Sequence, residues 1–318
     1  MSKILCIIDG MDDPDFDLKK YPTLASFPRR EHVQTVPDGF KAGTLPCVLS
    51  LLGLTSPPPN IRGWVEALGA GIDLKPDDLI FRGSWVEVDG EGIGIGFCDE
   101  PDLLPKLKRA RYVSLGGYKG LLIIPKGASF VDSIPALLPF EILGRNARHF
   151  FGPDLPALRE ALTMLNSSNP QRVIIPWAAS VAQPLPPFPE RAAVVSGTNI
   201  IRGLAKALKM HHVSLTGMTG DTDTDLSTKT RLTLALAKKY PFTMLHIGGC
   251  DEAAHRMDKR GKEAFLSQID QLVLPELLAS NHTIRLVSDH GADPATGGHT
   301  GGKQPLFVRI GPEGKNIK

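Results

Sequence analysis

Three short apolar segments of this 318-residue chain run directly into acidic or histidine side chains. The segments and the polar residues that follow them are KILCII at 3–8 with Asp9, FTMLHI at 242–247 with Asp251 and His255, and TIRLVS at 283–288 with Asp289 and His290. Uninterrupted β-prone runs of this length are typical of parallel strands that are buried on both faces. Helical patterns separate them along the chain, so the sequence predicts an α/β fold: a mainly parallel sheet with helices on both faces.

The middle of the chain has a different pattern. Residues 79–88 and 93–97 alternate like an antiparallel hairpin around the turn DGEG, and 154–165 is predicted to be an amphipathic helix. We therefore expect 75–170 to form a smaller inserted α+β cap domain. The flanks, 1–74 and 171–318, are expected to form one metal-binding core.

Charge and composition exclude several classes of partner. The 36 basic and 34 acidic residues nearly cancel, which gives no electrostatic basis for binding nucleic acid or an anionic membrane surface. No segment is long and apolar enough to span a bilayer, and the first residues do not have the pattern of a signal peptide. The four cysteines are scattered without CxxC spacing, so reduced thiols in a cytoplasmic protein are expected.

The polar residues after the strands are candidate metal ligands. Parallel strands gather ligands at their carboxyl ends, and His299 follows the last of the three segments closely enough to join the group. Asp251 and His255 are four residues apart, which places both on one face of a helix. Taken singly, each of these residues is more often a helix cap or a hydrogen-bonded structural group. Together they suit divalent cations such as Zn²⁺ or Mn²⁺.

Thr44 has two interpretations. It opens the helical run that begins with GTLP at 43–46, where a threonine most often caps the helix. Alternatively, its hydroxyl is a nucleophile activated by a nearby cation, with the helix N-terminus facing a phosphoryl group. With Thr44 included, seven groups are available, which is enough for two adjacent cations.

Several other charged residues are candidates for roles around a substrate. Arg62 carries a guanidinium that suits phosphate or carboxylate, although a solvated surface arginine is the ordinary interpretation. Lys75 and Lys303 could add positive charge around a small phosphorylated substrate. For Glu66, Asp223 and Asp225 we expect helix caps or salt bridges.

Motifs along both flanks resemble the archaeal-type, cofactor-independent phosphoglycerate mutases of the alkaline phosphatase superfamily, with a shortened and divergent cap domain. The matching stretches are IIDGMDD at 7–13, GTLPCVLSLLG at 43–53, IRGWVEALGAGIDLKPDDLIFR at 61–82, TGDTDTD at 219–225, HIGGCDEAAH at 246–255, SDHGADP at 288–294 and GGHTG at 297–301. DEAxH followed by SDH and HTG, in that order, is a specific signal.

The resemblance implies an alkaline-phosphatase-like core and two divalent ions, usually manganese or zinc. One ion would be held by Asp9, Thr44, Asp289 and His290, and the other by Asp251, His255 and His299. Thr44 stands where the family has the serine nucleophile of a Gly-Ser-Asp motif. The implied reaction is transfer of a phosphoryl group to this hydroxyl and its return to the other hydroxyl of glycerate, which interconverts 3-phosphoglycerate and 2-phosphoglycerate.

The chain departs from the family pattern where the glycerate carboxylate would be held. The departures are Leu45 for the Asp of Gly-Ser-Asp, DEAAH for DEAGH at 251–255, GIGIGF at 92–97 for a basic run, Tyr118-Lys119 for a His-Arg pair and Pro176-Trp177 for an Arg-Gly pair. Two alternatives therefore accompany the mutase interpretation. One is a phosphatase or phosphodiesterase acting on another small phosphoester, and the other is a metal-binding homologue without catalysis.

Overall fold

The computed structural model describes residues 2–133, 144–146, 155–167 and 169–311. The chain forms two compact units, which we call the core unit (Met1–Pro57 with Leu185–Lys318) and the inserted unit (Pro58–Pro184). The boundaries between the units lie in two proline-rich segments, at 57/58 and 184/185, and not at the expected positions 74/75 and 170/171. The inserted unit is larger than expected because it includes a helix before residue 75 and a strand after residue 170.

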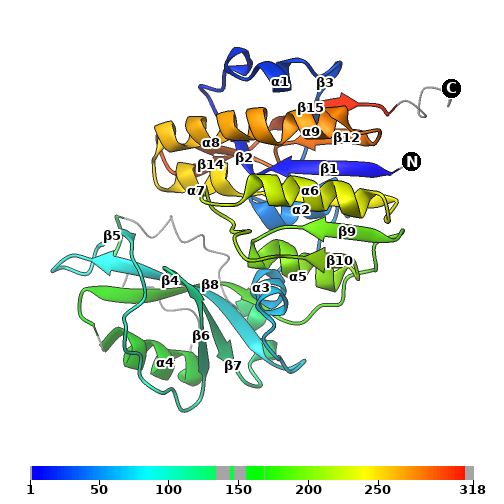
Figure 1. The fold of residues 1–318 in the computed structure, drawn as a ribbon. Coiled ribbons are helices and arrows are strands. Elements are labelled where there is room, and N and C mark those ends of the chain that lie inside the picture. The colour runs from blue at the N-terminus through cyan, green and yellow to red at the C-terminus, as the bar shows by residue number, and fades with distance from the viewer. Residues whose placement is uncertain (1, 134–143, 147–154, 168, 312–318) are drawn as a thin grey trace. The chain divides into compact units, whose positions relative to one another are not determined.

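In the described residues of the core unit, seven strands form one sheet, shown in Figure 1, in the order β10-β9-β11-β1-β12-β15-β3. Their bounds are β1 Lys3–Ile8, β3 Arg29–Gln34, β9 Ala192–Val195, β10 His211–Val213, β11 Phe242–Ile247, β12 Thr283–Val287 and β15 Lys303–Arg309. The first five strands are parallel, and β15 runs antiparallel to both of its neighbours. The predicted mainly parallel sheet is confirmed, with β1 between β11 and β12.

Helices bury both faces of this sheet. Their bounds are α1 Pro22–Ala25, α2 Thr44–Leu51, α5 Asn199–Ala207, α6 Leu226–Ala237, α7 Gly249–His255, α8 Lys259–Leu272 and α9 Leu274–Ala279, with a 3₁₀ turn, η1, at Leu18–Lys20. Along β1, Ile4, Cys6 and Ile8 join one hydrophobic cluster with side chains from α6, α8 and α9. Leu5 and Ile7 point to the opposite face and are buried as deeply.

A small second sheet lies beyond the carboxyl end of β1. It joins β2 (Gly10–Asp12), β13 (Gly291–Asp293) and β14 (Gly298–Thr300). The buried Lys262 of α8 links β13 to the segment that follows β2. Its Nζ donates to Asp13 Oδ2 at 2.6 Å and to the Ala292 carbonyl at 2.7 Å. Segments about 280 residues apart in sequence, which pair through Asp12 and Gly291, are thereby held at one edge of the main sheet.

The inserted unit has an antiparallel sheet of its own. Its elements are β4 Leu79–Val88, β5 Gly94–Phe97, β6 Arg111–Gly116, β7 Lys119–Ile124, β8 Arg172–Ser180, the helices α3 Arg62–Ala70 and α4 Pro156–Ser167, and a 3₁₀ segment, η2, at Ala128–Ser133. The predicted hairpin at 79–97 is present. The expected helix 154–165 corresponds to α4, although Asp154 lies outside the described residues. Strand β8 pairs along β4, which is why residues after 170 belong to this unit.

Residues 111–124 form a second hairpin, made of β6 and β7. Gly116, the last residue of β6, and Gly117, in the turn, both have positive φ. Among the described residues, no helix combines the length and the apolar character needed to cross a bilayer.

Gly10 is expected to be irreplaceable at the junction of the two sheets of the core unit. It has φ of +65°, and an added Cβ would lie 2.8 Å from Ala292 Cβ and 2.9 Å from Asp251 Cα. Gly39 has a similar φ of +80° but nothing within 4 Å, so it is a matched control. We predict that Gly39→Ala lowers the free energy of unfolding by about 1 kcal/mol and Gly10→Ala by about 3 kcal/mol or more. Urea unfolding of metal-free protein measures both, and equal losses would contradict the tight packing around Gly10.

Candidate metal centre

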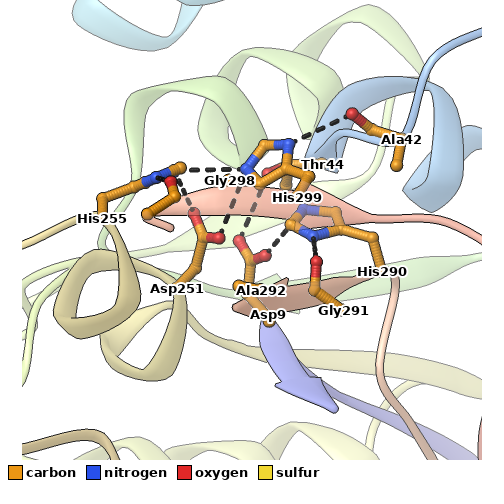
Figure 2. A network of polar contacts seen from close by, with 12 residues as sticks. Asp9, Ala42, Thr44, Asp251, His255, His290, Gly291, Ala292, Gly298 and His299 are labelled. Atoms are coloured by element: carbon orange, nitrogen blue, oxygen red, sulfur yellow. Dashed lines mark hydrogen bonds and ion pairs between the residues drawn. The ribbon is translucent and has the colours of Figure 1, made fainter. Parts of the chain in front are cut away.

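The seven predicted ligands lie together at the carboxyl ends of β11, β1 and β12; Figure 2 shows Asp9, Thr44, Asp251, His255, His290 and His299. They come from five places in the core unit: Asp9 directly after β1, Thr44 in the first turn of α2, Asp251 and His255 in α7, Asp289 and His290 after β12, and His299 in β14. The polar residues that follow the three central parallel strands thus converge at one edge of the sheet, as the sequence predicted.

Asp251 holds one half of the cluster. Because α7 is helical over Gly249–His255, His255 lies one turn after Asp251, and its Nε2 is 3.2 Å from Asp251 Oδ2. The second oxygen, Oδ1, lies 3.4 Å from His299 Nε2. The two Nε2 atoms of His255 and His299 are 3.1 Å apart. Three potential ligand atoms therefore surround one small volume.

Asp9 holds the other half. Its Oδ1 lies 3.2 Å from His290 Nε2, which is also 3.5 Å from Asp289 Oδ2. Its Oδ2 accepts a hydrogen bond from Thr44 Oγ1 at 3.3 Å. The rings of His290 and His299 are 4.1 Å apart, so the two halves are contiguous.

Backbone carbonyls orient the three histidines of this cluster. The Nδ1 atoms of His255, His290 and His299 contact the carbonyl oxygens of Gly297 at 2.7 Å, Gly291 at 3.1 Å and Ala42 at 3.1 Å. A carbonyl can only accept a hydrogen bond, so each Nδ1 carries a proton. When the imidazole is neutral, its Nε2 lone pair therefore points into the cluster, which is the usual arrangement of a metal-binding histidine.

The buried polar atoms of the cluster fit divalent cations. Asp9, Asp251 and Asp289 are 4%, 8% and 0% exposed, so three carboxylates share a site with little water. Among the described residues, Asp9 Oδ1, Asp251 Oδ1, Asp289 Oδ2 and His290 Nε2 are buried and make ion-pair contacts but no well-aligned hydrogen bond. Buried charges with incomplete partners are strongly unfavourable. Oxygen and imidazole ligands in this proportion suit Zn²⁺ or Mn²⁺.

This crowding shifts the pKa values of Asp9 and Asp289 in opposite directions. Burial and the Asp251 carboxylate raise the pKa of Asp9, but close polar contacts with the imidazoles of His246 and His290 outweigh them and hold the Asp9 pKa well below its usual range. Burial and the negative charge of Asp9 raise the pKa of Asp289 well above its ordinary value. The crowding therefore favours the charged form of Asp9 and the neutral form of Asp289.

The imidazoles take up further protons. Burial opposes the charged form of His290, but the carboxylates of Asp289 and Asp9 raise its pKa to about 10. Burial likewise opposes protonation of His255, and Asp251 raises its pKa to about 9. Near neutral pH, protons therefore occupy positions that cations would take.

His246 belongs to the cluster but was missed by sequence reasoning. It lies within β11, is fully buried, and places Nε2 3.2 Å from Asp9 Oδ2. Asp9, His246 and Asp289 form one group with metal-ligand spacing, and Asp251, His290 and His299 form another. The available signal was a histidine inside an otherwise apolar strand, because such a buried polar group needs a partner.

Thr44 does not cap its helix. Gly43 is the N-cap residue of α2, without a side-chain capping bond, and Thr44 is the first helical residue. The threonine is 7% exposed and directs its hydroxyl to Asp9. The capping interpretation is therefore wrong, and the position agrees with the alternative interpretation as a nucleophile.

Of the predicted substrate-binding residues, one belongs to the core unit and two to the inserted unit. Lys303 is exposed at the start of β15 and, in the described part of the chain, makes no ion pair with the cluster. Arg62 and Lys75 belong to the inserted unit. Of the charged residues with open roles, Asp225 caps α6 by accepting from the Thr228 amide at 2.9 Å, and Glu66 pairs with Arg62.

Metal binding is expected to release protons. At pH 7.5 the raised pKa values of His255 and His290 leave both rings charged, and a ligand must be neutral. We predict the release of about two protons as Mn²⁺ fills the site, and an affinity that increases with pH until these groups have titrated near pH 9 to 10. Calorimetric titration in buffers of different ionisation enthalpy measures the release. A binding enthalpy independent of the buffer would contradict this protonation pattern.

Comparison with known protein families supports the sequence resemblance. Residues 190–316 match the Metalloenzyme superfamily, and residues 32–97 match 2,3-bisphosphoglycerate-independent phosphoglycerate mutase. The chain is 25% identical to phosphoglycerate mutase 1 of this type from Methanothermobacter thermautotrophicus, over 98% of this chain and 90% of that protein. It is 26% identical to the corresponding mutase from Methanopyrus kandleri, over 96% of this chain and 87% of that protein.

Solved structures share the fold. A protein from Pyrococcus horikoshii, PH0037, superposes with a TM-score of 0.73 at 20% identity, covering 98% of this chain and 87% of its own. The cofactor-independent phosphoglycerate mutase from Thermoplasma acidophilum gives a TM-score of 0.52 at 17% identity, covering 98% and 90%. The chain is therefore phosphoglycerate-mutase-like, a distant relative of the archaeal 2,3-bisphosphoglycerate-independent enzymes with the same α/β fold.

Proposed function

We propose that this protein catalyses metal-dependent phosphoryl transfer through a phosphorylated Thr44, interconverting 3-phosphoglycerate and 2-phosphoglycerate. The observation that carries the proposal is the hydrogen bond between Thr44 Oγ1 and Asp9 Oδ2 at 3.3 Å, inside a buried cluster of carboxylates and imidazoles. The mutases to which the chain is similar act on phosphoglycerate, which supports this substrate.

The cluster has the ligands for two divalent ions, Mn²⁺ or Zn²⁺. Asp9, Thr44, Asp289 and His290 would hold one ion, and Asp251, His255 and His299 the other; the contacts of Asp9 with His290 and of Asp251 with His255 and His299 support this division. When bound, such ions supply a lowered hydroxyl pKa and positive charge for an in-line phosphoryl transfer.

The chain's own residues prepare Thr44 for attack. Asp9 accepts the Thr44 hydroxyl hydrogen, which fixes the direction of the remaining oxygen lone pairs. Thr44 is also the first residue of α2, so the positive end of the helix lies at the oxygen that would carry the phosphoryl group. In the first half-reaction, Thr44 Oγ loses its proton and forms a bond to phosphorus while the ester bond to glycerate breaks, and the released glycerate oxygen takes up a proton. In the second, the other glycerate hydroxyl loses its proton as its oxygen takes the phosphoryl group, and the Thr44 oxygen regains a proton.

A phosphatase or phosphodiesterase acting on another small phosphoester is the second candidate. It would use the same first half-reaction and let water accept the phosphoryl group. Apolar contacts in the inserted unit favour it at two positions where the resemblance leads us to expect a charged residue, Tyr118 and Pro176. Tyr118 stacks on Phe97 with ring centroids 4.9 Å apart, and Trp177, the residue after Pro176, is 6% exposed. A homologue that binds metal without catalysis is the third outcome to be tested.

We also propose that the protein is located in the cytoplasm. Cys6, Cys47, Cys98 and Cys250 are all free thiols, and three of them are buried. Reduced cysteines are typical of cytosolic proteins.

Thr44→Ala is predicted to abolish turnover, with a loss of about a thousandfold or more, because no other hydroxyl replaces the nucleophile. Bound metal should fall only slightly, since the other six predicted ligands remain. Thr44→Ser is the matched control and should retain activity together with an acid-stable phosphoenzyme after quenching. Full activity of the alanine variant would exclude Thr44 as the nucleophile.

With Mn²⁺ supplied, the purified protein is predicted to equilibrate 3-phosphoglycerate and 2-phosphoglycerate without net release of phosphate. The reason is that the glycerate must stay bound while the phosphoryl group is on Thr44. Phosphorus NMR follows both isomers and inorganic phosphate in one sample. Phosphate release without isomer exchange would favour the phosphatase, and inactivity on a panel of phosphoesters would favour the non-catalytic homologue.

A further inference from the structure

The main sheet of the core unit ends in a strand with an unpaired side. Strand β10 stands first in the sheet order, as Figure 1 shows, and within the described residues it pairs with β9 alone. The backbone N–H and C=O groups of β10 that point away from β9 therefore have no neighbouring strand. Such an edge is a template for another extended chain.

Side chains of β10 alternate between the two faces of the main sheet. His211 and Val213 lie on the face that α6 covers: the His211 ring stacks on Tyr240 at 5.4 Å, and Val213 packs against the hydrophobic cluster that α6 joins. His212 lies on the opposite face, where its Nε2 contacts the Ser196 carbonyl at 3.2 Å. A chain that adds to β10 therefore has two sets of side-chain neighbours.

Positive charge lies on the α6 side of this edge. The exposed Arg191 places its Cζ 5.4 Å from the ring of Tyr240, so that a guanidinium, a phenol and the His211 imidazole form one group beside β10. Among the described residues no carboxylate pairs with Arg191, and the adjacent Glu190 lies 3.8 Å from Lys3 Nζ. The charge of Arg191 is therefore available to an external anion.

Positive charge also lies on the α5 side. Arg202 and Lys206 are one helical turn apart in α5. Burial lowers the pKa of His212, and the nearby charges of Arg202 and Lys206 lower it further. The guanidinium of Arg202 makes no hydrogen bond or ion pair within the described part of the chain, and its Nε is buried without an acceptor. Both sides of β10 thus carry an arginine that lacks a carboxylate.

The strand at the opposite edge of the sheet, β3, has a balanced charge. Its Arg29 pairs with Glu31 of the same strand, and its Arg30 donates to the Ala25 carbonyl. At β10, like charges on both sides oppose pairing with a second copy of the same edge, whereas a chain with carboxylates on both faces is attracted. Charge complementarity therefore selects an acidic partner for β10.

We propose that β10 is a docking edge for an acidic, extended segment of a partner protein, which adds to the main sheet as one more strand. Main-chain hydrogen bonds to β10 supply affinity, and the alternation of the added strand directs its carboxylates to Arg191 on one face and to Arg202 and Lys206 on the other. This inference is independent of the proposed function, because none of these residues belongs to the metal centre.

Fluorescence anisotropy with a labelled acidic peptide of about ten residues tests the docking edge. The peptide combines Glu, Asp, Thr and Val with carboxylates at adjacent positions, so that both faces of its extended form are acidic. We expect saturable binding to the metal-loaded protein at low salt and weaker binding as the salt concentration rises. Two N-methylated forms, one for each alternate set of amides, keep the charge. One of them should bind about tenfold more weakly and the other nearly as well as the parent peptide, because only one set of amides pairs with β10.

Arg191→Gln and Arg202→Gln each remove one cation, from opposite sides of β10. Each should weaken peptide binding by about three- to fivefold, and the double variant by about tenfold or more. Arg29→Gln is the matched control, since it removes an exposed arginine from the opposite edge, and its affinity for the peptide should be unchanged. Hydrogen exchange should show new protection of the His211–Val213 amides when the peptide is bound, and none in β3.

Distinct results would overturn the docking edge. They are the absence of saturable peptide binding, equal affinity of both N-methylated forms and the parent peptide, and full affinity in the double variant. A single-stranded oligonucleotide of the same length that binds more tightly than the peptide would assign the positive charge to nucleic acid instead. Thr44→Ala should bind the peptide as the parent protein does, so failure of the nucleophile assignment leaves this inference intact.

Discussion

Repulsion among three buried carboxylates is the constraint on which the structure of the core unit depends. Asp9, Asp251 and Asp289 follow the three central strands, so the sheet that forms the hydrophobic core also forces their charges together. Such an arrangement persists only when positive charge is supplied. In the protein alone, the protonated imidazoles of His255 and His290 supply it, and in the proposed enzyme a pair of cations replaces those protons.

The surrounding architecture serves this arrangement. Carbonyls of Ala42, Gly291 and Gly297 fix the direction of the imidazoles, and the small sheet of β2, β13 and β14 brings His299 to the site. Thr44 does not cap α2; its hydroxyl donates a hydrogen bond to Asp9. Thr44 therefore takes part in the polar cluster and not in the helix cap that its place in the sequence favours. Such a choice is expected where side chains are held in position before a ligand binds.

Local patterns in the sequence predicted most of this site. Each of β1, β11 and β12 is an uninterrupted apolar run, and the polar residues after these runs converge because parallel strands end at one edge. The contact of His246 with Asp9 depends on which strands become neighbours, so a histidine inside an apolar strand indicates a buried polar group without identifying its partner. The membership of β8 in the inserted unit likewise depends on long-range pairing, which no local pattern encodes.

Manganese electron paramagnetic resonance tests the central claim most directly. Metal-free protein is titrated with Mn²⁺, and the number of bound ions and the coupling between their electron spins are read from the spectra. The account predicts two ions for each chain with a spin-coupled spectrum, because the two halves of the cluster are in contact through His290 and His299. A single bound ion, or two ions whose spectra are those of isolated Mn²⁺, would contradict it.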